Sequence, residues 1–377
     1  MEDQKGFIQK KSALTAILIL AVFIGLGLVS EWNKINQTPS DISRPQPPDI
    51  PLQQPKDITF QWKYRGSPYT LMATLYKTVY DYYQLKLREA AQMKFECNLP
   101  VYLEENCKVR ANQQLVVKLL ERPKEDNTIS QIALELKSIG EKAGLGKDQI
   151  VDLAVTFIQS IPYDEVKAEA IKSSTSTEGD FKLLPKHPYE TLYDNRGVCS
   201  DKSLLATSLI QELGYGVVIF TYDPLLFMTG HMGLGIKCPK EYSSYNSGYC
   251  YTEVTDPGWK VGIIPSSENS LETSWFHFPS IVDLKKEPKI LYIKGDGKTY
   301  NGVVENIRIQ EEKVVPLIEE IKKLDKDLTS YKLHLDLIES YKYLVAEEYN
   351  HYVDLYNKTL EIYQQKIEEL KKIIESY

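Results

Sequence analysis

The sequence is poor in the residues that build metal and phosphate sites. Its 377 residues include only 5 cysteines and 5 histidines, and no group of them has the spacing of a zinc site. The nearest approach to a glycine-rich phosphate loop is Gly146-Lys147. The position five residues before Gly146 is Glu141, however, and Asp148 stands where the motif needs serine or threonine. We therefore expect neither a bound metal nor a cofactor.

Positively charged residues are also fewer than negatively charged ones. There are 45 Lys and Arg residues against 52 Asp and Glu residues, which gives a net charge of -7, and this balance argues against a nucleic-acid binder. Hydrophobic residues make up 42 % of the chain and charged residues 26 %, proportions that exclude a wholly disordered protein. The length predicts about two domains, or one domain with extensions.

Long uncharged runs are confined to one place, residues 12–30. A helix of this length would extend roughly 28 Å, close to the thickness of a bilayer core. Lysines precede the run, so residues 1–11 should stay in the cytoplasm and the rest of the chain should lie outside it. We expect an uncleaved single-pass anchor in the cell membrane with an extracytoplasmic C-terminal domain; a cleaved signal peptide is the alternative.

Proline content and apolar spacing divide the remaining sequence. Residues 31–56 contain six prolines and are expected to form an extended tether. Residues 57–125 predict a module of two strands and a helix. Residues 126–300 predict an α+β domain in which helices precede the strands of an antiparallel sheet. The helices are expected at residues 130–143, 147–160 and 199–213, and the strands at residues 216–222, 231–238, 249–254, 258–265 and 289–295.

The C-terminal segment, residues 305–377, has no glycine and no proline beyond Pro316. Its apolar residues follow a heptad spacing over about eight repeats, with polar interruptions only at Lys342 and Thr359. This pattern predicts one long coiled-coil helix, with a helical hairpin folded on the globular domain as the alternative. A coiled coil would also allow the chain to form a homo-oligomer.

Four of the five cysteines have spacings that permit disulfides. Cys97 and Cys107 lie ten residues apart, and Cys238 and Cys250 end one predicted strand and begin the next. This assignment leaves Cys199 unpaired. In an oxidising compartment an unpaired cysteine needs a reason, and the surroundings of Cys199 in the sequence supply one.

Cys199 follows a turn and opens an apolar helix. A thiol at a helix start faces unpaired backbone N–H groups and the positive end of the helix dipole, which stabilise the reactive thiolate. A buried or disulfide-bonded cysteine is the commoner reading of such a position taken alone. His231 opens a predicted strand 32 residues later, and Glu253 lies on the next strand. A histidine so placed can act as base for the thiol, and an acid beside it can fix the imidazole tautomer.

These elements resemble the transglutaminase-like superfamily, and most closely a group of membrane-anchored archaeal and bacterial members. The resemblance covers about residues 148–265. Two departures stand out: Gly-Val-Cys-Ser replaces the common Gly-Asp-Cys-Glu, and Glu253 stands where many members have aspartate, so Asp256 is an alternative acid. The matching elements are Gly197-Val198-Cys199-Ser200-Asp201-Lys202, Gly230-His231-Met232-Gly233 and Tyr251-Thr252-Glu253-Val254-Thr255.

The resemblance implies a papain-like transglutaminase core, with helices packed on an antiparallel sheet, and a cysteine hydrolase mechanism. Cys199 would be the nucleophile, His231 the base and Glu253 the acid that orients it. By analogy with papain-like enzymes Gln159 is a candidate oxyanion donor, whereas Asp201 is expected to shape the helix start. The expected substrate is a protein or cell-wall peptide, cleaved rather than crosslinked.

Two further functions remain open at this point. The fold could serve as a non-catalytic cell-envelope scaffold, with the coiled coil driving assembly. The tail could instead regulate an enzyme by covering its active-site cleft.

Overall fold

A computed structural model gives the fold of most of the chain. Contacts divide the chain into Met1–Pro47 and Pro48–Tyr377, and all described residues belong to the second unit. The fold is α+β, about 60 % helical with two small antiparallel sheets. The residues described are 50–92, 101–124, 126–173, 181–222, 230–266, 271, 287–340 and 346–376.

The prediction of a membrane anchor is corrected by the structure. Among the described residues no helix is long and apolar enough to cross a membrane. The two longest, α10 (Val315–Ser340) and α11 (Ala346–Ser376), carry charged residues throughout. The predicted span itself, residues 12–30, lies outside the described residues, as does the predicted cytoplasmic segment 1–11. Within the described part of the chain, nothing supports the predicted single-pass membrane protein with an extracytoplasmic domain.

The described fold begins with a β-hairpin. Strand β1 (Pro55–Tyr64) pairs antiparallel with β2 (Ser67–Tyr76), and both residues of the turn, Arg65 and Gly66, have positive φ, as a two-residue hairpin turn requires. The rings of Phe60 and Trp62 each lie 5.3 Å from the ring of Phe157, edge to face. The segment predicted as a separate module therefore shares one core with the domain that follows it.

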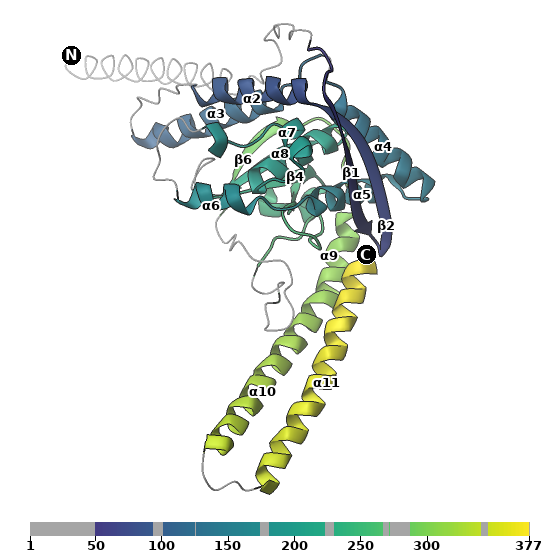
Figure 1. The fold of residues 1–377 in the computed structure, drawn as a ribbon, viewed down its shortest axis with the longest axis vertical. Coiled ribbons are helices and arrows are strands. Elements are labelled where there is room, and N and C mark those ends of the chain that lie inside the picture. Colours follow the sequence, from purple (N-terminus) through teal and green to yellow (C-terminus); the bar gives the residue numbers. More distant parts are fainter. Residues whose placement is uncertain are drawn as a thin grey trace, which may run out of the picture. The chain divides into compact units, whose positions relative to one another are not determined.

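Helices form most of the body around the second sheet. α8 is central, because α4, α5 and α7 pack on it and it packs in turn on strands of the sheet (Figure 1). Residues 201–210 of α8 are all buried, as expected for a helix with neighbours on every side. The helices before the sheet are α2 (Lys77–Ala91), α3 (Val101–Leu120), α4 (Thr128–Lys142), α5 (Lys147–Ser160), α6 (Glu165–Ser173), α7 (Pro188–Asp194) and α8 (Cys199–Glu212).

The second sheet is antiparallel, with strand order β5-β4-β3-β6. Because β4 and β5 run in opposite directions, the first residue of β4, His231, and the residue that follows β5, Glu253, lie at the same end of the sheet. Aromatic side chains, among them Phe220 and Tyr251, form a buried cluster on this sheet. The strands are β3 (Val217–Tyr222), β4 (His231–Lys237), β5 (Tyr249–Thr252) and β6 (Lys289–Lys294).

The strand predicted at residues 258–265 does not form. Gly258 and Gly262 have φ of +100° and +95°, conformations that an extended strand does not contain and that glycine adopts at little cost. The segment turns instead, and Trp259 packs against the C-terminal helices. The last strand of the sheet is β6.

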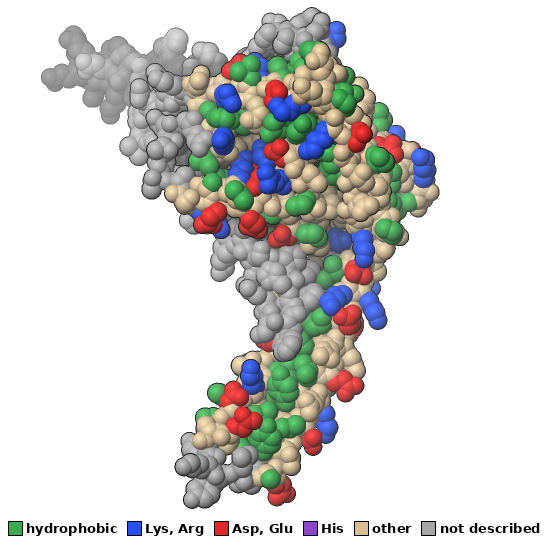
Figure 2. All heavy atoms as spheres, viewed as in Figure 1, with side chains coloured by type: hydrophobic (Ala, Val, Ile, Leu, Met, Phe, Trp, Pro, Cys, Tyr) green, Lys and Arg blue, Asp and Glu red, His purple; other side chains and the backbone are tan. Residues whose placement is uncertain are grey.

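The C-terminal segment forms a helical hairpin and not the single long helix predicted. α9 (Val303–Ile309) and a π-helical turn (Gln310–Val314) lead into α10, which lies beside α11 (Figure 1). Hydrophobic side chains gather along the hairpin (Figure 2). Residues 341–345, between the helices, lie outside the described residues and include Lys342, one of the two interruptions of the heptad pattern. Much of the predicted seam is thus filled by the same chain, through residues that include Ile321, Leu328, Tyr363 and Leu370.

Candidate active site

The start of α8 presents a free thiol. Cys199 is the first residue of the helix, is partly exposed and forms no disulfide. The fully buried Asp201 holds the helix start in place. Its carboxylate accepts the N–H of Val198 at 3.1 Å and the N–H of Lys186 at 2.7 Å, and pairs with the Lys167 ammonium at 2.8 Å. Asp201 therefore shapes the helix start, and the hydrogen bonds of its carboxylate go to Val198, Lys186 and Lys167.

The sheet supplies a buried histidine and a buried carboxylate. Nε2 of His231 lies 2.8 Å from Oε2 of Glu253, and the two side chains are 6 % and 5 % exposed. These residues come from the start of β4 and from just beyond β5, so the pairing of the two strands brings them together. Of the two predicted acids, Glu253 is the one hydrogen-bonded to the imidazole.

The Glu253 carboxylate is fully hydrogen-bonded. Oε2 also accepts the Tyr251 hydroxyl at 2.7 Å, and Oε1 accepts the backbone N–H groups of Val254 and Thr255 at 2.9 and 2.8 Å and the Thr255 hydroxyl. Burial alone would raise the pKa of this carboxyl, but the charge of His231 and these hydrogen bonds lower it to about 2. Glu253 is therefore an anion at any physiological pH.

His231 is held as a cation by its neighbours. Burial alone would lower its pKa, but the negative charge of Glu253, the hydrogen bond with Glu253 and the nearby Cys199 side chain raise it well above its ordinary value. Because Cys199 contributes to this shift, its side chain lies near the imidazole. The structure thus brings the three predicted catalytic residues near one another, with His231 hydrogen-bonded to Glu253 and the Cys199 side chain close to the imidazole.

Tyr251 is a site residue that the sequence analysis did not identify. Its hydroxyl lies 3.0 Å from Nε2 of His231 and donates to Glu253, and its ring is completely buried. The signal was present, because Tyr251 stands two residues before Glu253 and alternate strand residues share a face. The residue two positions before an acid on a strand is therefore a candidate partner of that acid.

The two supporting candidates lie near the site in different roles. Both amide hydrogens of Gln159 are used, since Nε2 donates to the carbonyls of Glu253 and Trp259 at 2.8 Å each. Gln159 therefore binds the backbone in this structure and does not present a free donor beside the thiol. Asp256 is partly exposed, and its charge acts on the buried ammonium of Lys202.

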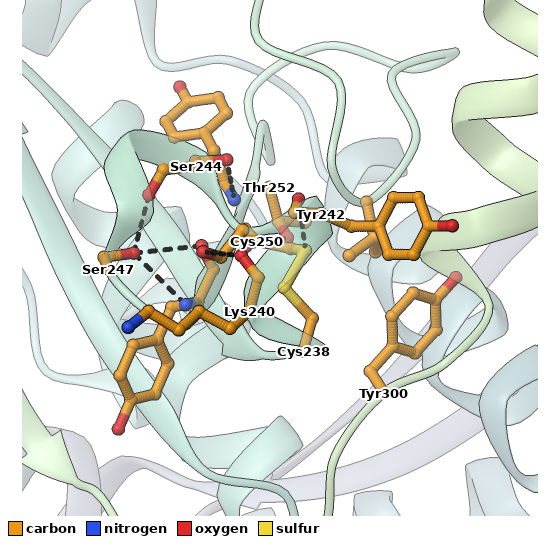
Figure 3. The surroundings of a disulfide bond; sticks show 12 residues. Cys238, Lys240, Tyr242, Ser244, Ser247, Cys250, Thr252 and Tyr300 are labelled. Carbon is orange, nitrogen blue, oxygen red and sulfur yellow. Dashed lines mark hydrogen bonds between the residues drawn. A yellow bond between two sulfur atoms is a disulfide. The ribbon is translucent and has the colours of Figure 1, made fainter.

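A disulfide closes the turn between β4 and β5. Cys238 and Cys250 are joined (Figure 3), which ties the end of one site-bearing strand to the start of the other. Within the same turn the Ser244 hydroxyl accepts the N–H of Tyr251 at 2.9 Å. Cys107 is also disulfide-bonded; Cys97, its predicted partner, lies outside the described residues.

The described residues contain no group of three or more His, Cys, Asp or Glu side chains placed to hold a metal ion. Comparisons of the chain with protein-family models, with curated proteins and with solved structures found no match.

Proposed function

We propose that the chain is a transglutaminase-like cysteine hydrolase that cleaves amide bonds in a protein or peptide substrate. The observation that carries the proposal is the meeting of Cys199, His231 and Glu253 from three separate elements. The thiol is partly exposed, whereas the imidazole and the carboxylate behind it are buried. A substrate can reach the nucleophile, while the groups that activate it are shielded from water.

The first half of the reaction forms a thioester. Because Nε2 of His231 faces Glu253, Nδ1 is the nitrogen left to hold the proton of Cys199. The thiolate sulfur attacks the amide carbonyl, the C–N bond breaks, and the imidazolium gives its proton to the leaving amine. The N–H of Cys199, which no carbonyl within the helix can accept, is a donor for the developing oxyanion.

The second half returns the free enzyme. Neutral His231 takes a proton from water, the hydroxide adds to the thioester carbonyl, and the carbon–sulfur bond breaks to release a carboxylic acid. The sulfur leaves as thiolate beside the imidazolium, as at the start. An amine in place of water would give transfer instead of hydrolysis, through the same intermediate.

The thioester is the species to look for. We expect p-nitrophenyl acetate to acylate Cys199 in a burst, detected by intact mass and assigned by peptide mapping, and we expect the adduct to decay in water. Cys199→Ala should abolish the adduct at this site. His231→Gln should slow acylation by at least about a hundredfold, the usual scale of a general base. Acylation of Cys199 at the same rate in both wild type and His231→Gln would refute the mechanism.

One observation favours a scaffold as a second candidate. The helical hairpin exposes large hydrophobic side chains, with Leu333 at 59 % and Leu337 at 47 %, and exposed apolar surface marks interaction sites when it is contiguous. A scaffold would not need a reactive thiol. The absence of any thioester adduct, together with self-association that Leu333→Ser abolishes in sedimentation, would favour this second function.

A further inference from the structure

A completely buried lysine lies one turn into the helix that carries the thiol. Lys202 follows Cys199 by three residues on α8 and has no exposed surface. Its ammonium donates to three backbone carbonyls, those of Gln159 at 3.1 Å, Ile161 at 2.8 Å and Thr255 at 2.6 Å. An ammonium has three N–H donors, so these carbonyls use all of them. Burial lowers the pKa of Lys202 to about 8.

A second buried side chain, Gln159, also hydrogen-bonds to the backbone of residues 253–259. Gln159 sits near the end of α5, and its amide donates to the carbonyls of Glu253 and Trp259. Residues 253–259 are thus bound at three carbonyls by two side chains. One side chain comes from the helix of the thiol and the other from the helix that packs beside it.

These contacts matter because the sheet does not extend as far as the acid. Strand β5 ends at Thr252, and its pairing with β4 ends there too. From Glu253 onward, strand pairing no longer fixes the backbone. The ammonium of Lys202 also acts electrostatically on the region of Glu253 and Asp256. Burying a cation is costly unless its hydrogen bonds are made, and the three carbonyls meet this condition for Lys202.

We propose that Lys202 and Gln159 are positioning residues that form a clamp, holding the segment 253–259 so that the Glu253 carboxylate stays on His231. The inference builds on the proposed function, since it names the residues that keep the catalytic acid in place. The clamp acts through the backbone carbonyls of the segment and touches neither the substrate nor the thiol. Its loss should loosen the Glu253–His231 contact while the sheet and α8 remain folded.

The titration of His231 in the full-length protein, followed by NMR of labelled histidine, tests the clamp. We expect Lys202→Met to release the His231 proton at a pH at least one unit lower than wild type, because the carboxylate no longer stabilises the imidazolium. Lys260→Met is the matched control. Lys260 is likewise buried and its pKa is likewise lowered by burial to about 8, but its charge acts on Asp152. The control should titrate like wild type at His231.

A second variant covers the case in which Lys202→Met does not fold. Gln159→Leu removes the other half of the clamp without burying an unpaired charge, and it should lower the titration midpoint of His231 in the same direction. If His231 titrates as in wild type in every clamp variant that folds, the inference is overturned. Failure of the proposed function would appear elsewhere, as a wild-type protein that forms no thioester while the clamp variants still shift His231.

Discussion

At the scale of single residues, the contact between His231 and Glu253 dominates the electrostatics of the site. The two side chains are buried together at 2.8 Å, where each would be costly without the other. The pKa of the histidine is raised and that of the glutamate is lowered to about 2. Both shifts favour the charged pair, so the pair stabilises the folded state over a definite range of pH.

The pH dependence of stability follows from the signs of the two shifts. Because the pKa of His231 is raised, this residue stabilises the folded state fully at pH values below its ordinary pKa of 6.5. This stabilisation is lost as the pH rises through the pKa of His231 in the folded state. Because the pKa of Glu253 is lowered, this residue stabilises the folded state at pH values above its ordinary pKa of 4.5. This stabilisation is lost as the pH falls towards 2. We expect Glu253→Gln to cost on the order of 3 kcal/mol near pH 5.5.

Chemical denaturation of wild type and Glu253→Gln at several pH values checks this prediction. The difference in free energy of unfolding should be largest between about pH 4.5 and 6.5 and should shrink on either side. Glu165→Gln is a control, because Glu165 lies on the exposed face of α6. A difference that does not vary with pH would contradict the charged pair.

The sequence predicts the site residues that local patterns mark, but not contacts between segments that are far apart in the chain. Cys199, His231 and Glu253 are recognisable from their order along the chain and their places at the ends of elements, since Cys199 opens α8, His231 opens β4 and Glu253 follows β5. Tyr251 follows from strand alternation alone. The contacts of Lys202 do not, because they join backbone carbonyls from segments more than forty residues distant, and a backbone carbonyl carries no sequence signature.

At the scale of elements, the pairing of β4 with β5 leaves no room for a side chain at Gly233. A Cβ atom there would lie 2.4 Å from a ring carbon of Tyr251, far inside van der Waals contact. The hydroxyl of the buried Tyr251 in turn donates a hydrogen bond to the Glu253 carboxylate. A change at Gly233 therefore reaches the site through the sheet without touching Cys199.

We expect Gly233→Ala to lower the free energy of unfolding by about 1–3 kcal/mol, the usual cost of overpacking. It should also reduce the reactivity of Cys199, because Tyr251 must shift. Gly295→Ala, just beyond the end of β6, is the matched control, since a Cβ there meets only the Tyr249 hydroxyl, at 3.6 Å. Thermal unfolding and thiol alkylation measure both effects. Equal stability of the two variants would contradict the packing described.

Helices and strands were predicted correctly where an apolar repeat continued over several turns. The prediction was wrong where backbone conformation, and not the apolar pattern, determined the structure. The helix predicted at residues 147–160 coincides with α5, because its repeat continues over several turns. The strand predicted at 258–265 is absent, because an apolar pattern does not reveal positive φ at Gly258 and Gly262. The tail shows the same limit, because a heptad repeat fits both a long helix and a hairpin.

At the scale of the whole described unit, the helical hairpin and the site segment share a core. Trp259, whose carbonyl accepts a hydrogen bond from the Gln159 amide, packs in one cluster with residues of α10 and α11. The hairpin therefore packs in the same hydrophobic cluster as the segment that carries Glu253. Its packing should support the stability of the fold.

We expect Leu370→Ala to cost about 2–5 kcal/mol, as for other buried leucines. Leu370 has no exposed surface within this cluster. Leu337→Ala on the same hairpin is the control, since Leu337 is 47 % exposed, and it should stay within about 0.5 kcal/mol of wild type. Urea denaturation gives both values. A near-neutral Leu370→Ala would show that α10 and α11 do not pack as described.

The alkylation rate of Cys199 at pH 6 tests the Cys199–His231 pair most directly. An ordinary thiol, with a pKa of about 8.5, is almost entirely protonated at this pH and reacts slowly. Iodoacetamide should modify Cys199 of the wild type at least about tenfold faster than a model cysteine peptide, and His231→Gln should remove this advantage. Wild type reacting at the rate of the peptide, and unchanged in His231→Gln, would contradict a catalytic thiol.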